Sequence, residues 1–317
     1  MNKLFFYSSI FLSLFLMFSS NQHISENKKL ISEFIPIGNL YEIENKNMHI
    51  LNGGEGDVTV IFSSGWGTTN PSADFYPLYN KIQKKSKFVV YDRFGYGYSD
   101  LTEKSRDIDI IVNEIKLGLE KSGQTPPYIF VAHSLASLEV LRYTQKYPEE
   151  IKGILFLDAG NPEEYALGIN NFAGIAISFF SKEMMNLGIT RLLKDNENFE
   201  KEFFSDLNDL KFLAEDLKEE YKKSYFLKAN NFTIHEEMKM SKKNALKVLN
   251  DKSIFEIPIT IITAVNSENN ESWIKSQQKF KEWSNNSKHV MLNGEHYIHH
   301  YFPEIIIEEI INLINMN

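Results

Sequence analysis

Short apolar runs alternate with longer amphipathic stretches from about residue 34 to the end of the chain. Runs such as VIF at 60–62 and ILFL at 154–157 have the length and the β-branched or aromatic content of strands. The stretches between them repeat apolar residues every three or four positions, which is typical of helices. Strands are predicted at residues 40–44, 48–51, 58–62, 88–91, 128–132, 153–157, 259–265 and 289–292, and helices at 73–84, 108–122, 135–147, 272–284 and 303–315.

Four of these strands are continuous apolar runs, which indicates a sheet that is covered on both faces. They are VIF at 60–62, FVVY at 88–91, YIFVA at 128–132 and ILFL at 154–157. Strands of this kind occur in mostly parallel sheets with helices on either side, so the pattern predicts an α/β fold. The first two strands are predicted to form an antiparallel hairpin, and the glycine-rich segment 52–56 turns the chain into the third. No helix follows these glycines, so they do not indicate a dinucleotide site.

The alternation stops between residues 161 and 254, where helical patterns continue without a clear strand. Helices are predicted at 175–193, 199–213 and 214–228. The block lies between the predicted strands 153–157 and 259–265, which favours a helical cap over the carboxyl ends of the strands, where open α/β sheets bind ligands. Its stripe of apolar side chains is more typical of packing than of ligand contacts. The stripe consists of Phe179, Phe180, Met184, Met185 and Leu187.

The first 25 residues have the pattern of a targeting or anchoring segment. Lys3 precedes an uncharged run at 4–18, and polar residues follow at 19–26. As a helix the run would be about 23 Å long, shorter than the ~30 Å hydrocarbon core of a bilayer, which favours a signal peptide over a spanning helix. Cleavage after Ser19 or Ser20 would place a large residue at position −3, so an uncleaved anchor stays an alternative. We expect export from the cytoplasm, with secretion or membrane anchoring.

Composition narrows the classes of function. The chain has 317 residues with a net charge of −8, and no Lys/Arg-rich run, so nucleic acid is not an expected partner. It has no cysteine, which excludes disulfides, zinc–thiolate sites and a cysteine nucleophile. Neither composition nor pattern indicates an oligomeric state.

A candidate nucleophile lies where the predicted strand 128–132 runs into the next helix. Ser134 occupies this junction, in which a serine on a tight turn projects above the sheet beside a helix N-terminus. Such a turn needs small residues two positions before and after the serine, and here they are Ala132 and Ala136. The usual G-x-S-x-G is therefore A-x-S-x-A. A serine can also begin a helix simply as an N-cap.

Further motifs in the same order resemble the α/β-hydrolase superfamily. They are VIFSSGWG at 60–67, VYDRFGYGYSD at 90–100, GILFLDAG at 153–160 and NGEHY at 293–297. The resemblance covers about residues 38–160 and 255–315. It implies an α/β-hydrolase core formed by residues 34–160 and 255–317, with 161–254 as an inserted helical cap.

The resemblance implies that His296, in the loop after the last strand, is the general base. His133 is expected to point away from the nucleophile. His299 and His300 have a spacing that could hold a metal on a helix, but no carboxylate is placed as in H-E-x-x-H, which favours packing or a solvated surface. No metal and no cofactor are expected.

Two carboxylates compete for the role of the acid that orients His296. Asp158 follows the strand 153–157, and Glu268 follows the strand 259–265, where most of the superfamily carries its acid. Asp158 is preferred because the shorter carboxylate is the commoner partner of the imidazole in such triads. Alternatively, Asp158 is a turn residue and Glu268 a solvated charge.

The resemblance also implies the oxyanion donors and a structural turn. Two N–H groups that point at the developing negative oxygen stabilise the transition state, and by resemblance they are the backbone N–H groups of Trp66 and Leu135. Asp92 and Arg93 belong to a turn and are assigned no chemistry.

Two functions from different classes are compatible with these residues. The first is a serine hydrolase that cleaves an ester or related small acyl substrate through an acyl-enzyme, with Ser134, His296 and Asp158 as its triad. The alternative is a non-catalytic protein that uses the same fold and pocket for binding, which the two alanines of the turn favour. A serine at position 134 argues against dehalogenase and epoxide hydrolase chemistry, for which related enzymes use an aspartate. The sequence does not indicate the natural substrate.

Overall fold

The computed structural model describes residues 25, 27–168, 213–265 and 271–316. The predicted leader at 1–25 and the predicted helices at 175–193 and 199–213 lie outside these ranges, except for Ser25 and Leu213. Glu268 lies outside them as well. Among the helices that are described, none combines the length and the apolarity that crossing a bilayer requires.

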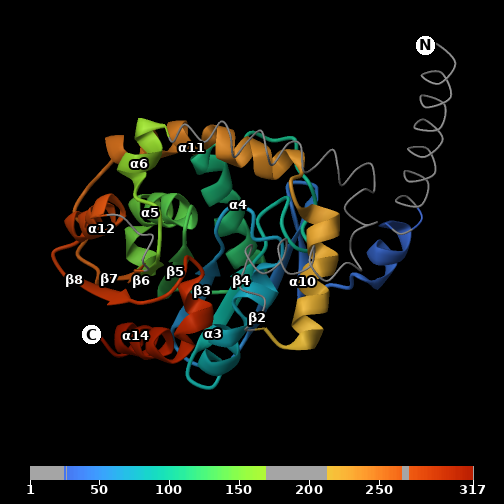
Figure 1. Ribbon diagram of the computed structural model, residues 1–317, viewed down its shortest axis with the longest axis horizontal. Coiled ribbons are helices and arrows are strands. Elements are labelled where there is room, and N and C mark those ends of the chain that lie inside the picture. The colour runs from blue at the N-terminus through green and yellow to red at the C-terminus, as the bar shows by residue number, and fades with distance from the viewer. Residues whose placement is uncertain (1–24, 26, 169–212, 266–270, 317) are drawn as a thin grey trace, which may run out of the picture.

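One eight-stranded sheet forms the centre of the fold (Figure 1). Its spatial order is β1-β2-β4-β3-β5-β6-β7-β8, and in the part from β4 to β8 the strands pair parallel with one another. β1 and β2 pair antiparallel, as the sequence predicts, and β2 pairs antiparallel with β4. The strands are β1 (Asn39–Ile43), β2 (Lys46–Gly53), β3 (Thr59–Ser63), β4 (Lys87–Tyr91), β5 (Tyr128–His133), β6 (Ile151–Leu157), β7 (Ile259–Ala264) and β8 (Ser287–Leu292).

Helices cover both faces of this sheet, so the predicted α/β sandwich is confirmed. The predicted helix at 73–84 is divided at Phe75 into two short helices, and Pro77 lies in the first turn of the second. On one face lie α3 (Tyr76–Ile82) and α14 (Pro303–Asn315), and on the other lie α4 (Ile108–Lys121) and α5 (Ala136–Lys146). The remaining short helices near the sheet are α2 (Pro71–Asp74), α12 (Glu271–Gln278) and α13 (Ile298–Tyr301).

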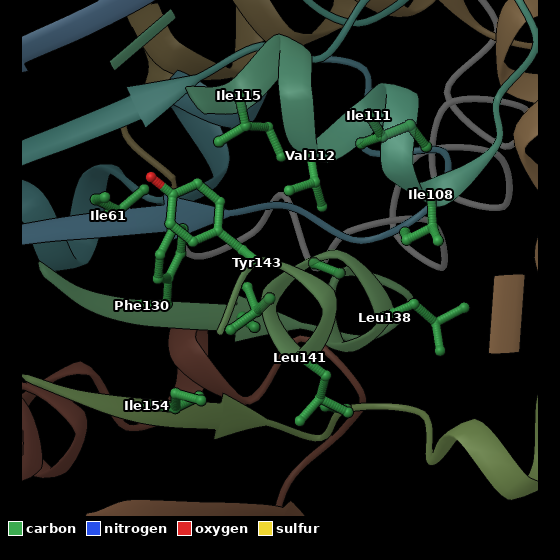
Figure 2. Packing of buried hydrophobic residues seen from close by; sticks show 14 of the residues in the cluster. Ile61, Ile108, Ile111, Val112, Ile115, Phe130, Leu138, Leu141, Tyr143 and Ile154 are labelled. Atoms are coloured by element: carbon green, nitrogen blue, oxygen red, sulfur yellow. The ribbon is translucent and has the colours of Figure 1, made fainter. Parts of the chain in front are cut away.

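Strand side chains alternate between two separate hydrophobic clusters. On β5, Phe130 packs with α4 and α5, whereas its neighbours Ile129 and Val131 belong to the cluster under α3 and α14. Figure 2 shows Phe130 beside Tyr143 of α5, with the apolar face of α4 above them. Because both faces are filled in this way, the strands are rigidly held, and the loops at their carboxyl ends have defined positions.

Three described helices come from the segment predicted to be a cap: α6 (Pro162–Leu167), α10 (Glu215–Lys228) and α11 (Phe232–Asn250). The sequence predicts α10 closely but names no helix at α6 or α11. Helix α11 lies along the α4 and α5 side of the molecule in Figure 1, and its N-terminal half contacts the loops that follow β3 and β4. The division at residues 161 and 254 stays a prediction.

Candidate active site

Ser134 lies between β5 and α5 on a sharply turned backbone. Its φ of 54° is unusual for a residue with a side chain, and Ala132 and Ala136 on either side of the turn are buried. The turn is fixed to the next strand, since Ser134 donates its N–H to the carbonyl of Leu157 (3.3 Å) and accepts one from Gly160 (3.1 Å). The strand-to-helix junction that the sequence predicts is therefore present, and alanine at both small positions is compatible with it.

His296 lies in the loop between β8 and α13, with its imidazole between a hydroxyl and a carboxylate. Its Nε2 is 3.0 Å from the Oγ of Ser134, and its Nδ1 is 2.7 Å from an oxygen of Asp158. The histidine side chain is 44% exposed, whereas that of Asp158 is 4% exposed. An imidazole with one nitrogen on a buried carboxylate and the other on a hydroxyl can accept the hydroxyl proton.

Asp158 is held in place by three backbone and side-chain contacts besides His296. It follows β6 at a φ of 41°, and its own N–H donates to the carbonyl of Ile262 (2.7 Å). Its second oxygen accepts the N–H of Ala264 (3.0 Å) and the indole N–H of Trp273 (2.9 Å). These donors fix the rotamer in which the other oxygen faces the imidazole. Glu268, the alternative acid, lies outside the described residues.

The loop after β3 approaches the nucleophile from the opposite side. A Cβ placed on Gly65 would lie 2.9 Å from the Cβ of Ser134 and 2.9 Å from Nδ1 of His133, so only glycine fits there. Trp66 follows directly, and its indole N–H donates to the carbonyl of Ile234 on α11 (2.9 Å). The peptide between Gly65 and Trp66 thus lies beside Ser134, as an oxyanion donor must. The other predicted donor, Leu135, begins the turn into α5.

His133 ends β5 and packs against the loop that carries His296. Its Nε2–H donates to the backbone carbonyl of His296 (3.0 Å), and the two rings pack at a centroid distance of 4.6 Å. Burial and the neighbouring histidines hold the pKa of His133 well below its usual range, so it stays neutral. The expectation that His133 points away from Ser134 stays a prediction, and the contact with His296 is a neighbour that the local sequence does not show.

His299 and His300 are fully buried around one carboxylate. Each places its Nε2 3.0 Å from the same oxygen of Asp74 in α2. Although burial alone would raise it, the two histidines hold the pKa of Asp74 far below its usual range. Within the described ranges, Asp74, His299 and His300 form the one group of side chains whose ligand atoms are close enough to hold a metal. Its hydrogen bonds join α13 to α2, which is a packing role.

Two features near the site are not predicted from the sequence. One is Trp273 on α12, which lies in a polar stretch of the sequence after β7 and gives no local sign that it contacts Asp158. The other is α11, whose start is marked by Asn231, an N-cap residue that precedes a helical pattern at 232–250. That N-cap signal could have identified the helix, but not its contact with Trp66.

The sequence matches a known family over most of its length. The sequence model described as alpha/beta hydrolase fold matches residues 58–303. Among curated proteins, the chain is 30% identical over 275 residues to the uncharacterized protein YbdG of Bacillus subtilis, which covers 85% of this chain and 83% of that protein.

Solved structures with similar folds have different activities. The epoxide hydrolase of Bacillus megaterium matches with a TM-score of 0.65 at 16% identity, over 88% of this chain and 100% of that one. The enol-lactonase of Burkholderia xenovorans matches with a TM-score of 0.62 at 12% identity, also over 88% and 100%. At these identities the likeness concerns the fold, so the chemistry must be argued from the residues of this chain.

Proposed function

Because the chain belongs to the family with the α/β-hydrolase fold, we propose that it is a serine hydrolase that cleaves an ester or a related acyl substrate. The observation that carries this proposal is the continuous hydrogen-bonded chain from Ser134 through His296 to Asp158, with separations of 3.0 Å and 2.7 Å. A hydroxyl, an imidazole and a carboxylate in this order activate an oxygen nucleophile.

The acylation step follows from this geometry. Oγ of Ser134 attacks the carbonyl carbon of the substrate while Nε2 of His296 accepts the hydroxyl proton. Asp158 stabilises the imidazolium through Nδ1, and the N–H groups of Trp66 and Leu135 bind the negative oxygen of the tetrahedral intermediate. The intermediate collapses as the C–O bond of the ester breaks, and the alcohol leaves with the proton from His296.

Deacylation repeats these steps with water. His296 takes a proton from a water molecule, whose oxygen attacks the acyl carbon, and the bond to Ser134 then breaks as the proton returns to Oγ. The acid product leaves and the free serine is restored. The reaction proposed here needs no cofactor.

The nucleophile type favours acyl chemistry among the activities found on this fold. The similar structures include an epoxide hydrolase and an enol-lactonase, and lactone opening is an acyl transfer to water. A neutral serine with an adjacent general base is suited to attack on a carbonyl. Peptidase, lipase, lactonase and thioesterase activities share this chemistry, and the side chains of the cap would select among them.

The proposal is tested by labelling the full-length protein with a fluorophosphonate and locating the adduct by peptide mass spectrometry. The probe reacts efficiently only with an activated serine, so the adduct is expected on Ser134. Ser134→Ala should abolish labelling and turnover of p-nitrophenyl acetate and butyrate. Ser122→Ala removes a serine at the C-terminus of α4, whose hydroxyl bonds only within its own helix among the described contacts, and should keep both.

Equal ester turnover by the wild type and by Ser134→Ala would overturn the proposal. A folded wild-type protein without any adduct on Ser134 would also do so, and would favour the non-catalytic binding function.

A further inference from the structure

Arg93 is a fully buried guanidinium in the turn that follows β4. Its guanidinium donates four hydrogen bonds to oxygens, and one terminal nitrogen lies 3.1 Å from a fifth oxygen, on Glu237. Two of these oxygens are backbone carbonyls of the loop after β3, and the other three belong to carboxylates. A motif that looks like a simple structural turn in the sequence therefore reaches the loop that faces Ser134.

The two carbonyls belong to consecutive residues of the oxyanion loop. One terminal nitrogen of Arg93 donates to the carbonyl of Ser64 (2.7 Å), and the other donates to the carbonyl of Gly65 (3.2 Å). The carbonyl of Gly65 and the N–H of Trp66 are the two ends of one peptide group. Arg93 therefore holds the carbonyl end of the peptide whose N–H end is the proposed oxyanion donor.

This contact has an electronic effect as well as a geometric one. A cation on the carbonyl oxygen of a peptide polarises the group and makes its N–H a stronger donor. The guanidinium and its surroundings are buried, so water screens this effect little. Arg93 can thus both aim the N–H of Trp66 and strengthen it.

Two carboxylates on different helices hold the guanidinium in this position. Glu139 of α5 lies 3.1 Å from one terminal nitrogen, and Glu237 of α11 lies 3.1 Å from the other. Helix α5 begins just after Leu135, which is the second proposed donor, so Arg93 connects both donors. The guanidinium also stacks on the ring of Tyr96, 4.4 Å from its centroid, a contact suited to a planar group.

A second buried arginine shows which of these contacts are special. Arg106 is as buried as Arg93 and pairs with Glu114 at 2.9 Å, also beneath α11. Its guanidinium pairs with the carboxylate of Glu114, and its backbone carbonyl accepts from Asn244 of α11. Among the described residues, its partners do not include the loop after β3. An ion pair that served only the packing of α11 would resemble that of Arg106. The bonds to Ser64 and Gly65 are the additional feature of Arg93.

We propose that Arg93 is a positioning residue for oxyanion stabilisation, which it supports by binding the carbonyl of the Gly65–Trp66 peptide. Through its contact with Glu237, the position of α11 affects how well Arg93 holds this peptide. The inference rests on the proposed serine hydrolase function. It assigns no bond-making step to Arg93, which acts through the backbone of the loop.

The test compares Arg93→Lys with Arg106→Lys in the full-length protein. Lysine keeps the charge but cannot bind two carbonyls and two carboxylates at once. We expect Arg93→Lys to lower kcat for p-nitrophenyl butyrate by about tenfold to a hundredfold with KM changed less than about threefold, since the lost interaction acts in the transition state. Arg106→Lys should keep kcat within about twofold of the wild-type value, although it should lose about as much thermal stability as Arg93→Lys.

A second readout separates oxyanion support from general damage to the fold. A trifluoromethyl ketone with a butyl chain forms a tetrahedral oxyanion adduct on the serine, and its affinity should fall in Arg93→Lys by the same factor as kcat/KM. All rates are divided by the concentration of serine that fluorophosphonate titrates, so that unfolded protein does not contribute. If Arg93→Lys does not fold, Glu237→Gln replaces it, and at least a threefold loss of kcat is expected.

The outcomes distinguish the inference from the function on which it rests. A wild type that hydrolyses the ester, with unchanged kcat and ketone affinity in Arg93→Lys, overturns the inference alone. An equal loss of kcat in Arg93→Lys and Arg106→Lys also overturns it, because a general structural role is then sufficient. If the wild type turns over the ester no faster than Ser134→Ala, both proposals are overturned.

Discussion

Two residues of the hydrogen-bonded chain have backbones at positive φ, Ser134 at 54° and Asp158 at 41°. Residues with side chains adopt this region at a cost of about 1–3 kcal/mol, and they keep it only where neighbouring contacts hold them. Here the ends of β5 and β6 are bonded to each other through Ser134, Leu157 and Gly160. At the scale of single residues, backbone strain thus places both side chains above the sheet, facing His296.

The identity of the acid can be tested by two parallel substitutions. Asp158→Asn keeps the size of the side chain but removes the charge that orients and stabilises the imidazole, so kcat should fall about a thousandfold or more. Glu268→Gln should change kcat by less than about twofold. Ester turnover is measured for both variants after circular dichroism has shown that they are folded. Loss of activity in Glu268→Gln with activity kept in Asp158→Asn would reverse the assignment.

Helix α11 links the described part of the cap segment to the loops of the candidate site. Asn231 caps it, and its side-chain oxygen accepts the N–H groups of Thr233 (3.0 Å) and Ile234 (3.2 Å). The amide nitrogen of the same side chain donates to the carbonyl of Gly95 (2.7 Å), in the turn that also contains Arg93. One side chain therefore begins the helix and fixes its first turn beside the loops of the site.

Asn231→Ala should lower the free energy of unfolding by about 1–2 kcal/mol. The variant removes the cap and leaves the buried carbonyl of Gly95 without this donor. Lys239→Ala, at an exposed position of the same helix, is the control and should change the free energy by less than about 0.5 kcal/mol. Urea unfolding followed by tryptophan fluorescence gives both values, and equal midpoints for the two variants would contradict the expectation.

Charge buried between the sheet and α11 gives the whole molecule a pH-dependent stability. Burial raises the pKa of Glu139 to about 7, despite Arg93 beside it and with the added repulsion of Glu237. Tyr91 donates to the same carboxylate. The unfolded chain loses this proton near pH 4.5, so between 4.5 and 7 the folded state binds more protons. The stabilisation from Glu139 is complete below this range and is lost as the pH rises through it.

This contribution is measured as a difference between the wild type and Glu139→Gln. Burial lowers the pKa of His133 and His299, which changes the stability in the opposite direction over part of the same range, so the slope of one protein does not isolate Glu139. The free energy of unfolding of the wild type minus that of Glu139→Gln should fall from pH 5 to pH 7. A difference that stays constant would show that Glu139 has an ordinary pKa in the folded state.

The local sequence pattern was sufficient to predict the strands of the sheet and to indicate the family. Each of the eight strands overlaps a predicted one, and β3 to β7 are apolar runs because strands buried on both faces need apolar residues at consecutive positions. The match of the alpha/beta hydrolase fold family over residues 58–303 confirms the superfamily that the ordered motifs resemble. The cap segment is less clear in the sequence, since α11 packs through mixed polar and apolar contacts that weaken its periodicity.

By itself, then, the sequence determined the strands, most helices of the core and the candidate Ser134, because these depend on residue type and short-range spacing. The ordered motifs also indicated the family, and the resemblance to it indicated His296 and Asp158. Tertiary structure alone decided which distant groups meet. His296 lies 162 residues from Ser134 and 138 from Asp158, yet the parallel register of β5, β6, β7 and β8 brings their loops to one edge. The ring of His133 against His296, and Arg93 behind the oxyanion loop, depend on packing between segments whose distance in space no local pattern encodes.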